Sequence, residues 1–167
     1  FAKSEIVPSN KDRFLRKETL QGFVHDEASA FFGGLAGNAG LFSTARDVAR
    51  VYQMLLNGGE IDGQRYLSKE TCQLFTTETS KISRRGLGFD KPDADDPKKG
   101  NCASAAPAEV YGHTGFTGTC AWVDPVNELV YVFLSNRIYP DVTNRKLNQL
   151  HIRERIQGAI YDAMKKK

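Results

Sequence analysis

His113-Thr114-Gly115-Phe116-Thr117-Gly118 gathers small and hydroxylated residues around two glycines, directly before an apolar strand. Glycine carries no Cβ, so a ligand can lie against the backbone of such a stretch. The stretch therefore predicts the edge of a strand that forms one wall of a binding site. For the His-Thr-Gly triplet taken by itself, a plain hairpin strand with a chance histidine is the alternative.

The residues that follow predict a sheet and a helix on top of it. Segments 117–123 and 129–135 have strand character and are joined by the turn sequence Asp124-Pro125-Val126-Asn127-Glu128. Segment 129–134 is apolar on both faces, which predicts a central strand with cover above and below. Between 147 and 163 apolar residues recur at helical intervals. A long amphipathic C-terminal helix should therefore lie on the sheet.

Two helices are expected earlier in the chain. Thr44 and Asp47 have the spacing of a capping box, so a helix should begin at Ser43 or Thr44 and end at the Asn-Gly-Gly of 57–59. Its expected apolar face comprises Ala45, Val48, Val51, Tyr52 and Leu55. Ser68 is the expected N-cap of a second, short helix that reaches about residue 76.

The remaining segments are expected to be irregular. Residues 1–20 are polar and mixed, with a turn signal at Pro8-Ser9-Asn10, and predict an arm without a core of its own. Residues 33–40 form a glycine-dense turn that lacks the Gly-Lys-Ser/Thr ending of a phosphate loop, which argues against a nucleotide site. Residues 90–109 predict a long surface loop that could border a cleft. We expect one domain over 1–167, in which 1–23 is the arm.

Composition excludes several classes of function. The 167 residues are 40% hydrophobic and 26% charged, which is ordinary for a globular domain. A net charge of +3 gives no nucleic-acid signal, and no apolar run approaches the ~20 residues of a membrane helix. Phe1 in place of Met indicates that the chain was cut, so any signal peptide would lie upstream.

No metal or disulfide framework is expected. Cys72, Cys102 and Cys120 are odd in number and widely spaced, so buried free thiols are favoured over a single bridge. His25 is followed by two acidic residues, but adjacent residues point apart and no second histidine completes a zinc site. The aspartates of 93–96 lack the other ligands of a calcium loop. We expect neither a metal nor a cofactor.

Several motifs, in the right order, resemble the serine β-lactamase and penicillin-binding-protein superfamily, in particular its class C-like members. The matching stretches are Gly37-Asn38-Ala39-Gly40-Leu41-Phe42-Ser43-Thr44-Ala45-Arg46-Asp47, Gly86-Leu87-Gly88-Phe89, which resembles a strand of the family, His113-Thr114-Gly115 with Gly118, and Ser135-Asn136-Arg137-Ile138-Tyr139-Pro140. Val24-His25-Asp26-Glu27 also resembles a bacterial subset in which such a domain follows an N-acetylglucosaminidase. The resemblance spans about residues 24 to 164.

This resemblance implies an α+β fold, an antiparallel sheet with helices packed on it, and acyl transfer through a serine ester. His113 stands where the family has a lysine that meets the substrate carboxylate or assists proton transfer. Thr114 would offer a hydroxyl to the same group, and Gly115 would let the substrate approach. The backbone N–H of Phe116 would be half of the oxyanion hole. The implied substrates are acyl-D-amino acids or esters, in the bacterial cell envelope, the periplasm or outside the cell.

The sequence also departs from the family. It contains neither Ser-x-x-Lys nor Tyr-x-Asn; the nearest match, Ser43-x-x-Arg46, ends in an arginine that cannot act as a base. We therefore expect the C-terminal part of a domain, inert without its N-terminal part. Histidine is a weaker anchor for a carboxylate than lysine, and Ile138 replaces a substrate-contacting asparagine, so peptidase, esterase or amidase chemistry is favoured over β-lactamase activity. A non-catalytic binding module, or a structural module appended to a glycosidase, is the alternative.

Overall fold

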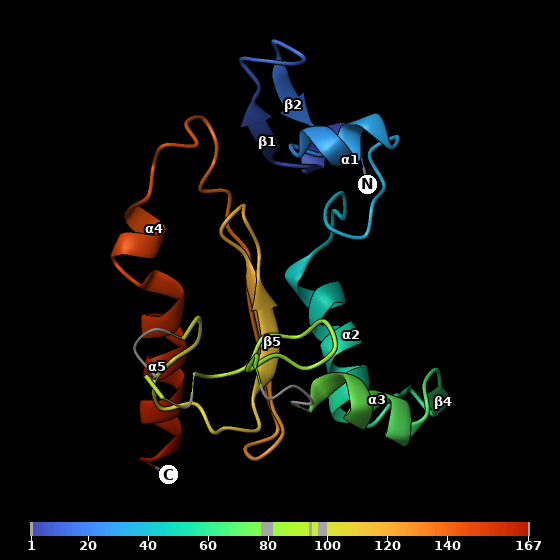
Figure 1. Ribbon diagram of the computed structural model, residues 1–167, viewed down its shortest axis with the longest axis vertical. Helices are drawn as coiled ribbons and strands as arrows, with labels where there is room; N and C mark the ends of the chain where they lie inside the picture. Colours follow the sequence, from blue (N-terminus) through green and yellow to red (C-terminus); the bar gives the residue numbers. More distant parts are fainter. Residues whose placement is uncertain (1, 78–81, 94, 97–99, 167) are drawn as a thin grey trace.

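The computed structural model describes residues 2–77, 82–93, 95–96 and 100–166. Its centre is an antiparallel sheet in the order β5-β6-β7, formed by Tyr111–Thr114, Cys120–Asp124 and Leu129–Phe133. Every residue of β6 is buried, because β6 has a strand on each side and a helix on each face (Figure 1). The predicted hairpin is confirmed, with both strands shorter than expected.

Helices cover both faces of this sheet. α2 (Ala45–Leu56) contacts β6 and β7 from one side, and α5 (Ile152–Met164) lies on the opposite side in Figure 1. The helix predicted from the capping box is confirmed: Thr44 is the N-cap and its side chain accepts a hydrogen bond from the N–H of Asp47. Val48, Tyr52 and Leu55 are half-buried as expected, whereas Val51 is exposed. The predicted α+β class, an antiparallel sheet with helices packed on it, is confirmed.

The core lies between the sheet and α5. Trp122 is 1% exposed and packs in a cluster with the side chains of Cys102, Val110, Cys120 and Tyr131. Burying large apolar side chains contributes about 1.5–3 kcal/mol each and is the main term that stabilises such a core. The three cysteines are buried and free, as predicted.

The C-terminal helix differs from the prediction in two ways. His151 adopts φ 49°, so the helical segment breaks into α4 (Lys146–Gln149) and α5. The buried face of α5 is polar and consists of Arg153, Gln157 and Tyr161, while Ile156 is 39% exposed. The predicted apolar stripe is confirmed only in part: Ile160 packs against the core, whereas the fully buried positions of α5 carry polar groups that form hydrogen bonds. The Tyr131 hydroxyl donates to the carbonyl of Arg153 and the Tyr161 hydroxyl to Asp124.

The N-terminal part is more regular than the predicted arm. Pro8-Ser9-Asn10 is not a turn but belongs to β1 (Pro8–Lys11), which pairs antiparallel with β2 (Thr19–Gln21), and Leu20 is buried. The short helices η1 (Lys3–Glu5) and α1 (Glu27–Phe31) flank this hairpin, and Asp26 caps α1. Strand pairing satisfies the backbone polar groups that a solvated arm would leave to water.

Two further expectations need correction. β7 is covered on both faces but lies at the edge of the described sheet, not at its centre. Gly86-Leu87-Gly88-Phe89 is not a strand; of the segment's neighbours, Asp90 alone forms an isolated bridge, with Gly112.

The second helix is confirmed as α3 (Lys69–Thr76), with Ser68 as its N-cap. A small hairpin, β3 (Glu60–Ile61) and β4 (Gln64–Arg65), connects α2 to α3.

The described helices include none that is long and apolar enough to span a membrane.

Candidate active-site edge

The outer edge of β5 has unpaired backbone groups. Its inner edge pairs with β6, and among the described residues Asp90 alone pairs with its outer edge, through two hydrogen bonds to Gly112 of 2.7 and 3.0 Å. Successive N–H groups of an extended strand alternate between its two edges. Gly115 donates inward, to the carbonyl of Thr119 at 2.8 Å. The N–H of Thr114 therefore faces the open edge. Phe116 lies in the turn after β5; its N–H belongs to the same planar peptide group as the Gly115 carbonyl, which accepts from the N–H of Gly118, and so points the opposite way, out of the turn.

A tight turn follows β5 and explains the glycines there. The N–H of Gly118 donates to the carbonyl of Gly115 at 2.9 Å, and Gly118 has φ +97°. A Cβ at Gly115 would collide with the hydroxyl of Thr119, and a Cβ at Gly118 with the hydroxyl of Ser135. Both glycines are thus required by the packing of the turn itself, whatever approaches the strand from outside.

His113 is half-exposed and faces an arginine. Its Nε2 lies 3.3 Å from Nη1 of Arg85, and its Nδ1 lies 2.7 Å from the carbonyl of Thr114. Arginine can only donate, so Nε2 accepts and Nδ1 carries the proton that bonds to Thr114. Arg85 therefore provides the permanent positive charge beside His113. Sequence reasoning missed Arg85, although its place just before the Gly86-Leu87-Gly88-Phe89 motif was a usable signal.

A buried carboxylate supports this side of the edge. Asp90 is 1% exposed; it forms an ion pair with Nε of Arg84 at 2.9 Å and accepts from Nδ2 of Asn101 at 2.8 Å. Burial alone would raise the pKa of Asp90, but these hydrogen bonds and the charge of Arg84 outweigh it and lower the pKa. Asp90 is therefore ionised, and it also lies 3.9 Å from Nε of Arg85.

Phe116 is the most exposed of the predicted site residues, with 58% of its surface accessible. Its ring contacts His25 and Arg137, which come from opposite ends of the chain. Ile138, one residue beyond Arg137, is fully buried, so its side chain cannot contact a ligand at this edge.

The edge combines two kinds of donor. Backbone N–H groups of Thr114 and Phe116 face outward, and the guanidinium of Arg85 lies beside His113. Such an arrangement can bind a carboxylate or stabilise an oxyanion, because preorganised donors lose little freedom when charge develops. Among the described residues, no three His, Cys, Asp or Glu side chains are grouped so that they could hold a metal ion.

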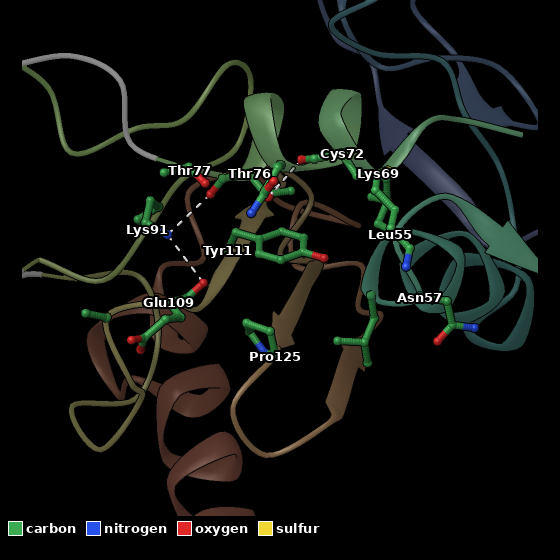
Figure 2. Close-up of a pocket in the computed structure, with 14 residues that line it drawn as sticks. Leu55, Asn57, Lys69, Cys72, Thr76, Thr77, Lys91, Glu109, Tyr111 and Pro125 are labelled. Carbon is green, nitrogen blue, oxygen red and sulfur yellow. Dashed lines mark hydrogen bonds between the residues drawn. The ribbon is translucent and has the colours of Figure 1, made fainter.

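A cavity separate from this edge lies at the start of β5 (Figure 2). It measures about 750 Å³, is lined by Leu55, Cys72 and Pro125 among others, and receives the ring of Tyr111. Nζ of Lys91 donates to the carbonyls of Thr76, Glu109 and Val110, each at 3.3 Å. Burial raises the pKa of the Cys72 thiol, which disfavours a reactive thiolate. None of the four predicted site residues lines this cavity.

Comparison with known proteins gives a family match and several relatives. A family model described as Beta-lactamase matches residues 6–154. Proteins named "Putative D-alanyl-D-alanine carboxypeptidase" from Escherichia coli (strain K12) and Salmonella typhi are 37% identical over 135 residues, which are 80% of this chain and 31% of each relative. The chain thus spans about a third of their length. The crystal structure of a penicillin-binding protein homolog from Caulobacter crescentus is 26% identical, covers 53% of this chain and 24% of that chain, and has a TM-score of 0.43.

Proposed function

Because the chain belongs to the Beta-lactamase family, and so to the serine hydrolase superfamily, we propose that it supplies one wall of the active-site cleft of an acyl-serine hydrolase. The observation that carries the proposal is the open edge of β5, where the N–H of Phe116 faces outward beside Arg85 and His113. The nucleophilic serine and its lysine come from outside the 167 residues, which contain no Ser-x-x-Lys. The chain alone is therefore inactive.

The four residues expected from the sequence then have distinct roles. The N–H of Phe116 donates to the oxyanion that forms when the serine attacks an acyl group, and Gly115 lets the turn that carries this N–H close. The Thr114 hydroxyl and Arg85 bind the carboxylate of the substrate. The Nε2 of His113, once Arg85 has turned to the substrate, takes the proton that the attacking serine releases and passes it to the leaving group.

We propose a peptide that ends in a D-amino acid as the substrate, hydrolysed in the cell envelope or periplasm. Two observations support it. The relatives named above are described as D-alanyl-D-alanine carboxypeptidases. A carboxypeptidase substrate ends in a free carboxylate, and a guanidinium pairs with a carboxylate through two parallel hydrogen bonds.

The experiment is a comparison of two substrates with the full-length polypeptide that carries this chain. A fluorescent penicillin should label one serine, which mass spectrometry of the adduct identifies. Arg85→Ala should raise KM about tenfold or more for a peptide ending in D-alanyl-D-alanine, because a bidentate charge pair is lost. It should leave hydrolysis of an uncharged ester within twofold. Arg46→Ala, on the exposed side of α2, is the matched control.

If neither a penicillin nor a fluorophosphonate labels a serine, the proposed enzymatic activity is refuted. That result would favour the alternative, a binding or structural module of the same fold, which the absence of Ser-x-x-Lys from this chain also allows. In an enzyme with an appended structural module, removal of residues 1–167 would leave the activity of the remaining domains unchanged. If Arg85→Ala affects both substrates equally, Arg85 does not bind the carboxylate of the substrate.

A further inference from the structure

The cavity at the start of β5 has apolar walls. Leu55 and Leu56 come from the end of α2, Cys72 from α3, and Pro125 from the turn between β6 and β7. The cavity measures about 750 Å³, which is within the size range of small-molecule binding sites. It can therefore hold a hydrocarbon group, which would displace water from these side chains.

Tyr111 places a hydroxyl in this cavity that has no hydrogen-bond partner in the described part of the chain. Tyr111 is 5% exposed, and burial raises its pKa, so the hydroxyl keeps its proton and can donate. Figure 2 shows the hydroxyl pointing across the cavity toward the side chain of Lys69. A buried donor without a partner is unfavourable, so a ligand that accepts from it gains affinity.

Two further donors lie on the side of the cavity to which the Tyr111 hydroxyl points. Lys69 is the first residue of α3, and within the described ranges its ammonium group forms no ion pair. Asn57 is the C-cap of α2; its side-chain oxygen accepts from Nε2 of Gln53 at 2.9 Å, which leaves its NH₂ group to donate. Figure 2 shows Lys69 and Asn57 together on this side. This end of the cavity therefore combines donors with a positive charge.

The acceptors of the cavity are engaged or lie away from this end. Nζ of Lys91 donates to the carbonyls of Thr76, Glu109 and Val110, each at 3.3 Å. Glu109 carries the one carboxylate among the described residues that line the cavity, and in Figure 2 this carboxylate lies on the side opposite to Lys69. The polar end near Tyr111 is therefore complementary to an anion that accepts hydrogen bonds.

We propose that this cavity binds a small molecule with a hydrocarbon body and one carboxylate. The hydrocarbon body lies against Leu55, Leu56 and Pro125. The carboxylate accepts a hydrogen bond from the Tyr111 hydroxyl and pairs with the ammonium group of Lys69. The bond to Tyr111 contributes more affinity, because Tyr111 is buried whereas Lys69 is exposed. The site uses none of the residues of the proposed catalytic cleft.

The test is calorimetric titration of the full-length polypeptide with decanoate, decanol and decylammonium, which share one hydrocarbon chain and differ in charge. Decanoate should bind at one site, decanol about tenfold or more weakly, and decylammonium without saturation. Tyr111→Phe keeps the ring and should raise the Kd of decanoate about tenfold or more. Lys69→Gln should raise it about two- to fivefold, because an exposed charge contributes less. Lys146→Gln, at an exposed lysine of α4, is the control and should bind as wild type does.

Thermal unfolding separates a ligand contact from a structural role of the hydroxyl. Without ligand, Tyr111→Phe should have the Tm of the wild type, because the hydroxyl bonds to no described residue. Decanoate should raise the Tm of the wild type more than that of Tyr111→Phe at the same concentration. The absence of saturable decanoate binding up to about 1 mM, or equal binding of decylammonium, would overturn the inference. A Tyr111→Phe variant that binds decanoate with the affinity of the wild type would also overturn it.

Discussion

Replacing Asp12 with asparagine should lower the free energy of unfolding by about 3 kcal/mol. Oδ1 of Asp12 accepts from the N–H groups of Phe14 and Leu15, and Oδ2 accepts from the N–H and Nε of Arg16. Asparagine keeps one accepting oxygen but presents an NH₂ group where the other was, facing the donors of Arg16. The two bonds to Oδ2 are lost, at about 1.5 kcal/mol for each bond to a charged group.

The effect should depend on pH in a defined direction. The Arg16 side chain, helped by three backbone N–H groups, holds the pKa of Asp12 well below its usual value of 3.8 although burial opposes this. The unfolded state then binds more protons than the native state below pH 3.8, so the contribution is fully present above that pH and is lost as the pH falls. The difference between wild type and Asp12→Asn should shrink by about 1 kcal/mol between pH 5 and pH 3.

Urea unfolding followed by fluorescence measures this directly, because Trp122 is the single tryptophan and is buried. The free energy of unfolding should depend on urea concentration with the same slope in both proteins, while the urea concentration at the midpoint should be lower for Asp12→Asn. Asp162→Asn, at an exposed position of α5, is the control and should change stability by less than about 0.5 kcal/mol. An Asp12→Asn variant as stable as that control at pH 7, or a difference that is equal at pH 3 and pH 7, would refute the reasoning.

Three other outcomes are expected. Trp122→Ala should lower the free energy of unfolding in urea by about 3–5 kcal/mol, because the ring is 1% exposed and its removal leaves a cavity in the core. A decrease below about 1 kcal/mol would contradict the central place of Trp122 in the core. Gly118→Ala should cost clearly more than Gly63→Ala: both have positive φ, but a Cβ at 118 meets Ser135 whereas nothing lies within 4 Å at 63. Burial raises the pKa of the Cys120 thiol to about 11 and that of Cys102 to about 12, so a thiol reagent at pH 8 should label neither until the chain unfolds.

Local signals predicted the elements well. The capping residues Thr44 and Ser68 gave the starts of α2 and α3, since a side-chain oxygen before an apolar period satisfies free N–H groups at a helix start. The motifs read in order predicted the superfamily, which the family match confirms. The roles of His113, Thr114, Gly115 and Phe116 stay predictions that the proposed experiments test.

The errors came from contacts between distant parts of the chain. Apolar periodicity cannot reveal that Gln157 is buried, because its partner is the N–H of Ala103 at 2.8 Å. A double-sided apolar strand such as β7 predicts cover on both faces but not its place in the sheet order. Likewise, Arg85 stands next to a family motif, but the motif does not indicate its contact with His113, and nothing local to His25 indicates its contact with Phe116.

The polar inner face of α5 determines the position at which this helix packs on the sheet. A stripe of leucines could slide along the sheet by one turn and still be covered. Here Arg153 donates to the carbonyl of Thr119, Gln157 accepts from Ala103, and Tyr161 donates to Asp124, so three consecutive turns each have one fixed partner. A shift by a single turn would break all three bonds at once, so α5 packs on the sheet in one register only.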